Sequence, residues 1–205
     1  KQLEALLMKL KINKYSPYFI DTSVSSCVRN FPRDRSIYMD IGCGDGEFIV
    51  ELAKDNPRKI CIGVEVKYGR IIKCLRKAEM YQLNNLKFIL SDATLLMDQI
   101  IPPKSLNKIF INNPDPWPKE KHEKNRILNS EFLKSLYKSL KRKGLLYITT
   151  DSIKYRNSIE KEVSILNFKK NNKLSNFDTK LPATRFQRFY INQNKKIYNI
   201  KLQKL

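Results

Sequence analysis

Five short apolar segments, separated from one another by turns and helical patterns, constrain the fold of this chain more than any other feature. A strand that is apolar on both faces needs cover on both faces, and parallel strands obtain it from the helices that connect them. The segments predict buried strands at residues 37–41, 60–66, 86–90, 108–111 and 145–149. The expected fold class is therefore α/β, a Rossmann-like, doubly wound and mostly parallel sheet.

Helices are expected between these strands because apolar residues recur there at helical spacing. Residues 46–53 and 68–83 predict two of them. Residues 130–140 predict a third, with Ser130 as its N-cap and Gly144 as the residue that ends it.

The two ends of the chain show different patterns. Leucines three and four apart over residues 1–12 indicate a basic helix, followed by a turn-rich stretch. Residues 189–191 and 197–202 alternate between apolar and polar side chains, which predicts a C-terminal antiparallel hairpin closing the sheet. We expect a lead-in over residues 1–35 and one folded domain over residues 36–205.

An acidic residue stands at or just after the end of each predicted strand. Five separate loops would rarely place an acid there by chance. Ligands of open α/β sheets bind outside the carboxyl ends of the strands, so we expect the binding site at this edge. The acids are Asp40, Glu65, Asp92, Asp115 and Asp151.

The first strand leads into its helix through Asp40-Ile41-Gly42-Cys43-Gly44-Asp45-Gly46-Glu47. Glycines in such a loop permit positive φ and let a ligand approach the backbone N–H groups. A dinucleotide fingerprint would need glycine in place of Glu47. The clustered acids disfavour a pyrophosphate and favour a cationic ligand, while Glu65 can accept from ribose hydroxyls and Asp92 from an adenine amine.

This combination resembles the class I S-adenosylmethionine-dependent methyltransferase fold, over residues 36–150. A glycine loop alone would predict no more than a tight strand-to-helix turn. Its link to two acids at the following strand ends makes the resemblance specific. The resemblance implies S-adenosyl-L-methionine as the cofactor, held by Asp40, Gly42, Gly44, Glu65, Asp92, Ala93 and Asn113.

The fourth predicted strand ends in a proline-rich turn, residues 109–119, that brackets Asp115 and the only tryptophan, Trp117. Each proline locks its own φ and biases the preceding residue towards extended geometry, so we expect both residues to be extended and rigid. A carboxylate beside an indole suits a flat ligand with polar edges, such as a nucleobase. The alternative interpretation is a surface turn followed by a solvated helix.

The charge of the chain indicates the kind of partner. Against 40 Lys+Arg stand 20 Asp+Glu, which leaves a net charge of +20. Such a charge predicts salt-sensitive binding to nucleic acid or to another anionic surface. Nucleotide bias in the source genome is the alternative, but the basic residues that flank the proline-rich turn favour nucleic acid.

Other classes of protein are disfavoured. No apolar run approaches the roughly 18 residues of a membrane-spanning helix. No signal-peptide pattern opens the chain, but the sequence leaves open whether a targeting segment was removed before Lys1. One histidine and the absence of a C-x-x-C pair argue against a metal site. We expect reduced cysteines and a cytoplasmic location. The cysteines are Cys27, Cys43, Cys61 and Cys74.

Three motifs resemble those of the tRNA (guanine-N7-)-methyltransferase family. They are Pro114-Asp115-Pro116-Trp117-Pro118-Lys119 with its trailing basic residues, Thr149-Thr150-Asp151, and Thr184-Arg185-Phe186. The resemblance implies methyl transfer to N7 of a guanine in tRNA, at the variable-loop guanosine. It also implies that the enzyme acts on tRNA without an obligatory partner subunit.

The resemblance assigns roles to individual residues. It makes Asp115 the catalytic position. It implies substrate contacts at Lys119, Asp151, Thr184, Arg185, Phe186 and Gln187, and tRNA-backbone contacts at Lys121, His122, Lys124 and Arg126. The family usually has glutamate at position 187. Gln187 keeps an acceptor oxygen but loses the charge. Whether this position still binds the N–H groups of guanine, as a carboxylate would, is therefore an open question.

Two alternative functions remain at this stage. Enzymes that methylate exocyclic amines resemble this chain at the fourth strand, but Asp115 stands where they have a proline. A non-catalytic RNA-binding module on the same fold is the other alternative. The presence of Asp40, Glu65, Asp92 and Asp115 together argues against it.

Overall fold

The structure is a computed structural model that describes residues 12, 14–22, 34–170 and 180–205. The predicted N-terminal helix and Cys27 lie outside these ranges, apart from Ile12. Within them, no helix is long and apolar enough to cross a membrane. The described cysteines, Cys43, Cys61 and Cys74, are buried and reduced.

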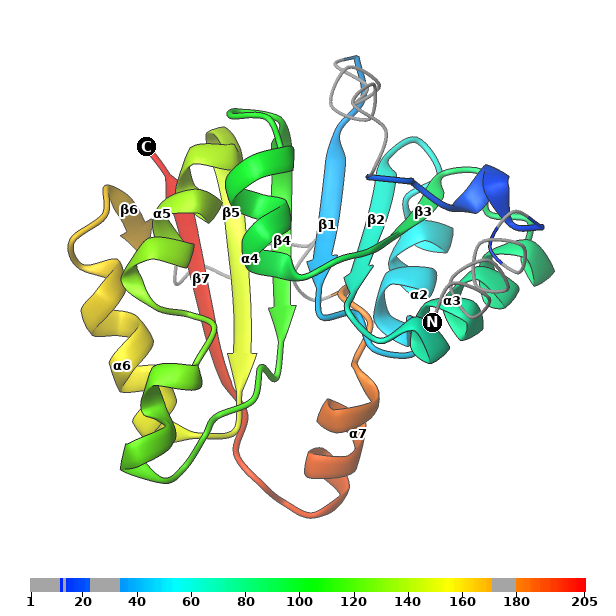
Figure 1. The fold of residues 1–205 in the computed structure, drawn as a ribbon. Coiled ribbons are helices and arrows are strands. Elements are labelled where there is room, and N and C mark those ends of the chain that lie inside the picture. Colours follow the sequence, from blue (N-terminus) through cyan, green and yellow to red (C-terminus); the bar gives the residue numbers. More distant parts are fainter. Residues whose placement is uncertain (1–11, 13, 23–33, 171–179) are drawn as a thin grey trace.

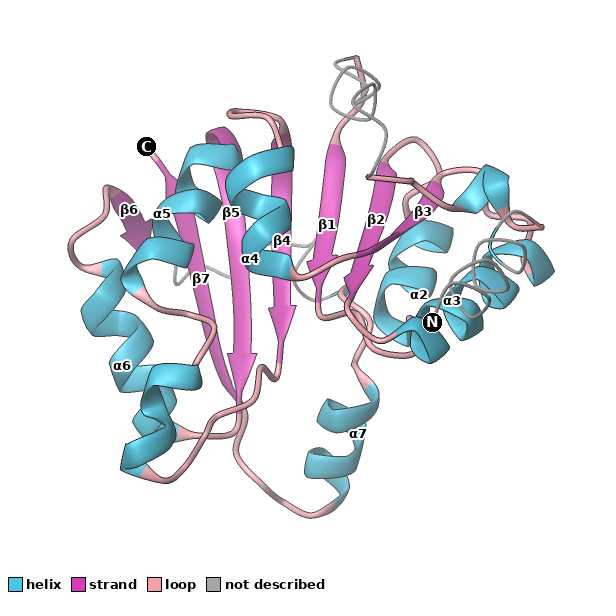
Figure 2. Ribbon diagram, viewed as in Figure 1, coloured by secondary structure: helices cyan, strands magenta, loops and turns pink. Residues whose placement is uncertain are grey.

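A seven-stranded sheet forms the centre of the fold, in the order β3-β2-β1-β4-β5-β7-β6 (Figures 1 and 2). The first five strands pair in parallel, whereas β7 runs antiparallel to both β5 and β6. The chain reverses its direction of winding between β1 and β4, which places a ligand-binding crevice at their carboxyl ends. The strands are β1 (Ile37–Ile41), β2 (Ile60–Glu65), β3 (Leu86–Leu90), β4 (Leu106–Asn112), β5 (Leu140–Thr150), β6 (Phe168–Lys170) and β7 (Tyr198–Lys204).

Helices cover both faces of the sheet. One apolar core lies between the strands and α2 and α3, and a second lies between the strands and α4, α5 and α6. The helices are α2 (Glu47–Asp55), α3 (Tyr68–Met80), α4 (Ala93–Leu95), α5 (Ser130–Ser139), α6 (Ile153–Val163) and α7 (Arg185–Asn192). Shorter helical turns are η1 (Ser16–Tyr18), η2 (Leu96–Ile100) and η3 (Glu120–Asn125). The predicted doubly wound α/β class is confirmed.

Helix α7 lies apart from both layers, beyond the carboxyl ends of the central strands at the bottom of Figure 1. It forms because Thr184 and Gln187 make a capping box, in which each side chain accepts from the other residue's backbone N–H. The predicted strand at residues 189–191 is therefore wrong. Strand β7 instead lies between β5 and β6 and runs antiparallel to both.

Two further boundaries differ from the prediction. Asn129, not Ser130, caps α5, because its side chain accepts from the N–H of Phe132 at 2.9 Å. Gly144 does not end that helix but lies inside β5. Leu140 pairs with Leu106 and Leu145 with Lys108, so residues 141–144 bulge out between two paired positions. A Cβ on Gly144 would lie 2.7 Å from the carbonyl oxygen of Lys141, which explains the glycine.

Candidate active site

The acids that follow the strands gather at one edge of the sheet, as predicted. Asp40 lies in β1, Glu65 ends β2 and Asp151 follows β5. Asp92 caps α4 after β3: its Oδ1 accepts from the N–H groups of Thr94 and Leu95. The cap engages Oδ1, so Oδ2 can accept from a ligand.

The glycine loop has the left-handed backbone that its sequence predicts. Gly42, Gly44 and Gly46 have φ of 74°, 59° and 78°, a region that other residues enter at a cost. A Cβ on Gly42 would meet nothing within 4 Å, whereas one on Gly46 would lie 2.8 Å from Sγ of Cys74. Gly42 thus leaves backbone accessible at the edge, and Gly46 lets the loop pack against α3.

Glu65 holds this loop in place. Its Oε1 accepts from the N–H groups of Val66 and Lys67 at 3.0 and 2.9 Å, and its Oε2 accepts from the N–H of Gly44 at 3.1 Å. The side chain is 6% exposed. A carboxylate oxygen can accept two hydrogen bonds, so Oε2 keeps one acceptor position for a hydroxyl group.

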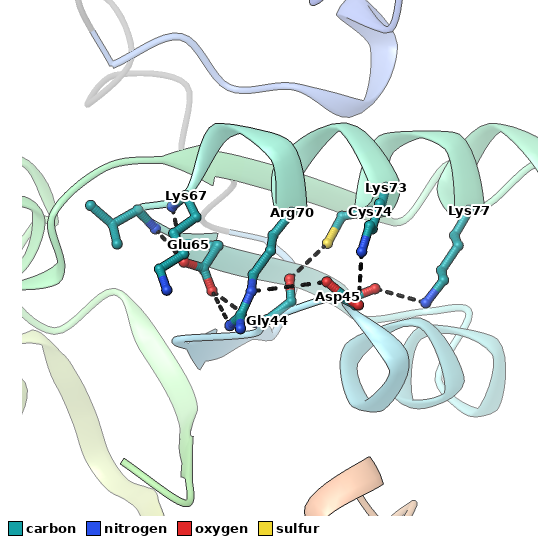
Figure 3. Close-up of polar contacts among 9 residues, drawn as sticks. Gly44, Asp45, Glu65, Lys67, Arg70, Lys73, Cys74 and Lys77 are labelled. Atoms are coloured by element: carbon teal, nitrogen blue, oxygen red, sulfur yellow. Dashed lines mark hydrogen bonds and ion pairs between the residues drawn. The ribbon is translucent and has the colours of Figure 1, made fainter. Parts of the chain in front are cut away.

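A row of cations on α3 binds the same loop (Figure 3). Arg70 lies 3.6 Å from Oε2 of Glu65 and 4.0 Å from Oδ1 of Asp45; Lys73 contacts Oδ2 of Asp45 at 3.3 Å, and Lys77 donates to its carbonyl oxygen at 2.8 Å. These cations offset the negative charge around the loop. They were not among the predicted site residues, although their three- and four-residue spacing places them on one face of a helix.

Asp40 is almost fully buried, at 2% exposure. Burial raises the pKa of Asp40 to about 7; the hydrogen bond from Asn112 opposes this rise and the charge of Glu65 adds to it. Nδ2 of Asn112 donates to Oδ1 of Asp40 at 3.2 Å. Asn112 was not among the predicted site residues; its position at the end of β4 was the available signal.

Asn113 connects β4 to the neighbouring elements. Its N–H donates to the carbonyl oxygen of Thr149, and its Nδ2 lies 3.5 Å from Oγ1 of Thr184. Its φ of 49° turns the chain out of the strand and into the proline-rich turn. The structure thus brings two of the predicted motifs, at β5 and at α7, against the end of β4.

The proline-rich turn presents Asp115 to solvent. Trp117 is half-buried, and its ring meets that of His122 edge-on at 5.7 Å between centroids. Trp117 was expected to be extended, but its φ is 41°. Two hydrogen bonds from the buried side chain of Arg126 hold the flanking carbonyl groups, which outweighs the bias set by Pro118.

The basic residues after the turn fall into two groups. Lys119, Lys121 and Lys124 are exposed, and their contacts with tRNA stay a prediction. Arg126 is 6% exposed and bonded within the protein. Its guanidinium is engaged by protein groups, so we correct the expected phosphate contact to an internal one.

The predicted substrate residues of α7 lie at its first turn. Thr184 is buried and is the N-cap of the helix. Gln187 is uncharged, and its Oε1 accepts from the N–H of Thr184 at 2.7 Å. Arg185 and Phe186 are exposed. The pKa of Tyr190 is raised, first by partial burial and then by its contact with Asp151, so α7 also reaches the end of β5.

A cavity of about 410 Å³ lies between this end of the sheet and α7. Its walls are mostly apolar, with Phe110 and Tyr147 stacked at 5.0 Å between ring centroids, and its polar lining includes Asn112, Thr149 and Gln187. Neither Glu65 nor Asp115 lines it. The cavity therefore adjoins the acidic edge without containing it.

Comparison with known proteins agrees with this architecture. The profile of a protein family described as "Putative methyltransferase" matches residues 34–200. A tRNA (guanine-N(7)-)-methyltransferase of Buchnera aphidicola subsp. Acyrthosiphon pisum (strain 5A) is 39% identical over 178 residues, which cover 84% of this chain and 74% of that protein.

Solved structures share the fold at low identity. The crystal structure of the 16S rRNA methyltransferase KamB has a TM-score of 0.64 and 13% identity, covering 88% of this chain and 93% of that one. The structure of SMU.1697c of Streptococcus mutans, described as "a putative methyltransferase" in complex with SAH, has a TM-score of 0.56 and 16% identity, covering 83% of this chain and 89% of that one. The sheet order and these structural matches show the class I methyltransferase fold. The chain belongs to the tRNA (guanine-N7-)-methyltransferase family.

Proposed function

We propose that this protein transfers a methyl group from S-adenosyl-L-methionine to N7 of a guanine in tRNA. The observation that carries the proposal is the meeting of the glycine loop, the acidic strand ends and the first turn of α7 at one edge of the sheet. Family membership and the net charge of +20 support tRNA as the substrate.

The residues at this edge fit that cofactor. Oε2 of Glu65 has an acceptor position for a ribose hydroxyl, and Oδ2 of Asp92 has one for an exocyclic amine. Gly42 leaves open space beside the backbone. We assign Asp40, near the end of β1, to the positively charged part of the cofactor. The cofactor supplies the electrophilic methyl group of its sulfonium. Ala93, Gly44 and Asn113 complete the proposed set.

Guanine N7 needs little chemical help. It carries an in-plane lone pair and no proton at neutral pH, so attack on a methyl group requires no general base. The tasks that remain are alignment of the two reactants and stabilisation of the purine cation that forms. We assign both to Asp115, whose carboxylate would accept from the N–H groups of the guanine edge and favour the positive ring.

The tRNA contacts extend from the turn to α7. Exposed lysines after the turn suit phosphate groups, which set the register of an RNA without reading its sequence. The proposed contacts are Lys119, Lys121, His122, Lys124, Asp151, Thr184, Arg185, Phe186 and Gln187. We further propose the variable-loop guanosine as the target, a cytoplasmic location, and action without an obligatory partner subunit.

Transfer of labelled methyl groups to unmodified tRNA tests the proposal. Chain cleavage directed at N7-methylguanosine should then cut the labelled tRNA once, in the variable loop. Incorporation of label without cleavage would indicate an exocyclic amine as the acceptor. Binding of tRNA without incorporation would indicate a non-catalytic RNA-binding module.

A further inference from the structure

Arg126 is a buried cation at the base of the proline-rich turn, with all of its described contacts inside the protein. Its Nε donates to the carbonyl oxygen of Pro116 at 2.8 Å, and its Nη2 donates to that of Trp117 at 3.4 Å. We propose that Arg126 is a positioning residue that fixes this turn and thereby aims the carboxylate of Asp115. The proposal rests on the function proposed above.

The turn needs such support because its backbone is strained. Trp117 has a φ of 41°, a region in which a bulky residue is an outlier. Its neighbour Pro118 also disfavours compact conformations at this position. A planar guanidinium can hold two carbonyl groups in a fixed relative orientation, which an ammonium cannot do. The two bonds therefore select the strained turn over an extended one.

Arg126 is itself held from two sides. Its Nη1 lies 2.9 Å from Oε1 of Glu123, and its Cζ lies 5.1 Å from the centre of the Tyr155 ring. Tyr155 is fully buried in α6, and its hydroxyl accepts from the N–H of Leu128 at 3.2 Å. The guanidinium thus anchors the turn to the apolar core, and this fixes the position of Asp115 relative to the sheet.

The single tryptophan gives a direct measurement of the turn. Trp117 is the only tryptophan of the chain, so its fluorescence reports this turn whether or not methyl transfer occurs. We expect Arg126→Lys to shift the emission of Trp117 and to raise its quenching by acrylamide. We also expect kcat for tRNA methylation to fall roughly ten- to hundredfold, since small misplacements of a catalytic group cost about that much. Affinity for S-adenosyl-L-methionine should stay within about twofold.

Arg126→Ala with added guanidinium provides a second measurement. Millimolar guanidinium chloride should restore part of kcat and of the Trp117 emission, whereas sodium chloride at the same ionic strength should restore neither. Arg156→Lys is a matched control. Arg156 also pairs with a glutamate, Glu160 at 3.1 Å, and lies over a tyrosine ring, Tyr198 at 5.6 Å. Its replacement should leave the Trp117 emission unchanged.

The outcomes separate the two proposals. If wild-type protein methylates guanine N7 and Arg126→Lys matches it in both kcat and Trp117 emission, the positioning role is refuted. A rise in KM for tRNA with unchanged kcat and emission would also refute it, in favour of a phosphate contact. If wild-type protein fails to methylate tRNA, the proposed function fails, and a shifted emission still supports the hold of Arg126 on the turn.

Discussion

Nη2 of Arg188 lies 2.7 Å from Oε2 of Glu47 and joins α7 to the first residue of α2. The same guanidinium donates through Nη1 to the carbonyl oxygen of Ala183, just before the N-cap of α7. One arginine therefore ties the proposed substrate helix to the helix that follows the glycine loop. Residues 141 positions apart in the sequence couple the two halves of the site.

Charge exchange tests this coupling. Glu47→Arg and Arg188→Glu each place like charges together, so each should raise KM for tRNA roughly two- to fivefold, the scale of an exposed ion pair. The double variant Glu47→Arg/Arg188→Glu should recover most of the loss, because the pair is restored with reversed polarity. Steady-state kinetics with tRNA measures the effect. Additive losses in the double variant would show that the two side chains act independently.

Asp115→Asn tests the catalytic assignment. The amide keeps the shape of the side chain and removes its charge, so the purine cation loses its stabilising partner. We expect kcat to fall by roughly 10²–10³, as for other electrostatic groups in active sites. Steady-state methylation at saturating tRNA measures kcat, and calorimetry should find cofactor affinity nearly unchanged. Turnover close to that of the wild type would remove Asp115 from the mechanism.

Gly46→Ala should destabilise the glycine loop. The new Cβ would lie 2.8 Å from Sγ of Cys74, at a φ of 78° that costs a non-glycine residue about 1–2 kcal/mol. We expect a lower free energy of unfolding and weaker cofactor binding, measured by urea titration and calorimetry. Gly69→Ala is the control, because a Cβ there meets nothing within 4 Å. Equal effects of the two changes would contradict the packing explanation.

Asp40 should make the stability of the protein depend on pH. Its folded pKa of about 7 lies above the ordinary value of 3.8, so the folded state binds more protons than the unfolded state between these values. The contribution of Asp40 to the free energy of unfolding is fully present below about pH 4. It falls as the pH rises towards 7, by about 1.4 kcal/mol for each unit of pKa difference. Asp40→Asn should flatten this fall, as measured by urea unfolding at pH 5, 6, 7 and 8. An unchanged slope would exclude Asp40 as its source.

Gln187→Glu should be tolerated and slightly stabilising. Oε1 of Gln187 accepts from the N–H of Thr184, and a carboxylate accepts the same bond while adding negative charge at a helix N-terminus. We expect a gain of about 0.3–1 kcal/mol in the free energy of unfolding. Gln193→Glu makes the same chemical change at the C-cap of α7, where it should be unfavourable. A loss of stability from Gln187→Glu would show that the amide group is required.

Local pattern predicted the parts of the fold that depend on neighbours in the sequence. The bounds of β1 and β3 are those expected, because a buried parallel strand is a short apolar run between turns. The pattern failed at residues 189–191, where apolar alternation suggested a strand. The capping box of Thr184 and Gln187 starts a helix there, and such a helix places apolar residues on its surface: Phe189 and Ile191 are 53% and 59% exposed.

The sequence predicted one part of the candidate site, the acids at the strand ends, but not the residues that contact them. The acids at the strand ends were found because parallel strands bring their carboxyl ends to one edge. Asn112, Tyr190 and the cations of α3 were missed, because each acts through a partner distant in the sequence. The cations could have been found from their spacing, but nothing local indicates that Asp45 is their partner.

The sequence by itself determined where the five parallel strands lie, the acidic residues at their ends and the position of the proline-rich turn, because these follow from residue periodicity and the restricted φ of proline. Only the tertiary structure decided that Arg126 faces inward, that Trp117 has a positive φ and that Asp40 titrates near neutral pH. The physical reason is that the energy of a charge depends on its burial and on its nearest partners. Packing between distant segments sets both.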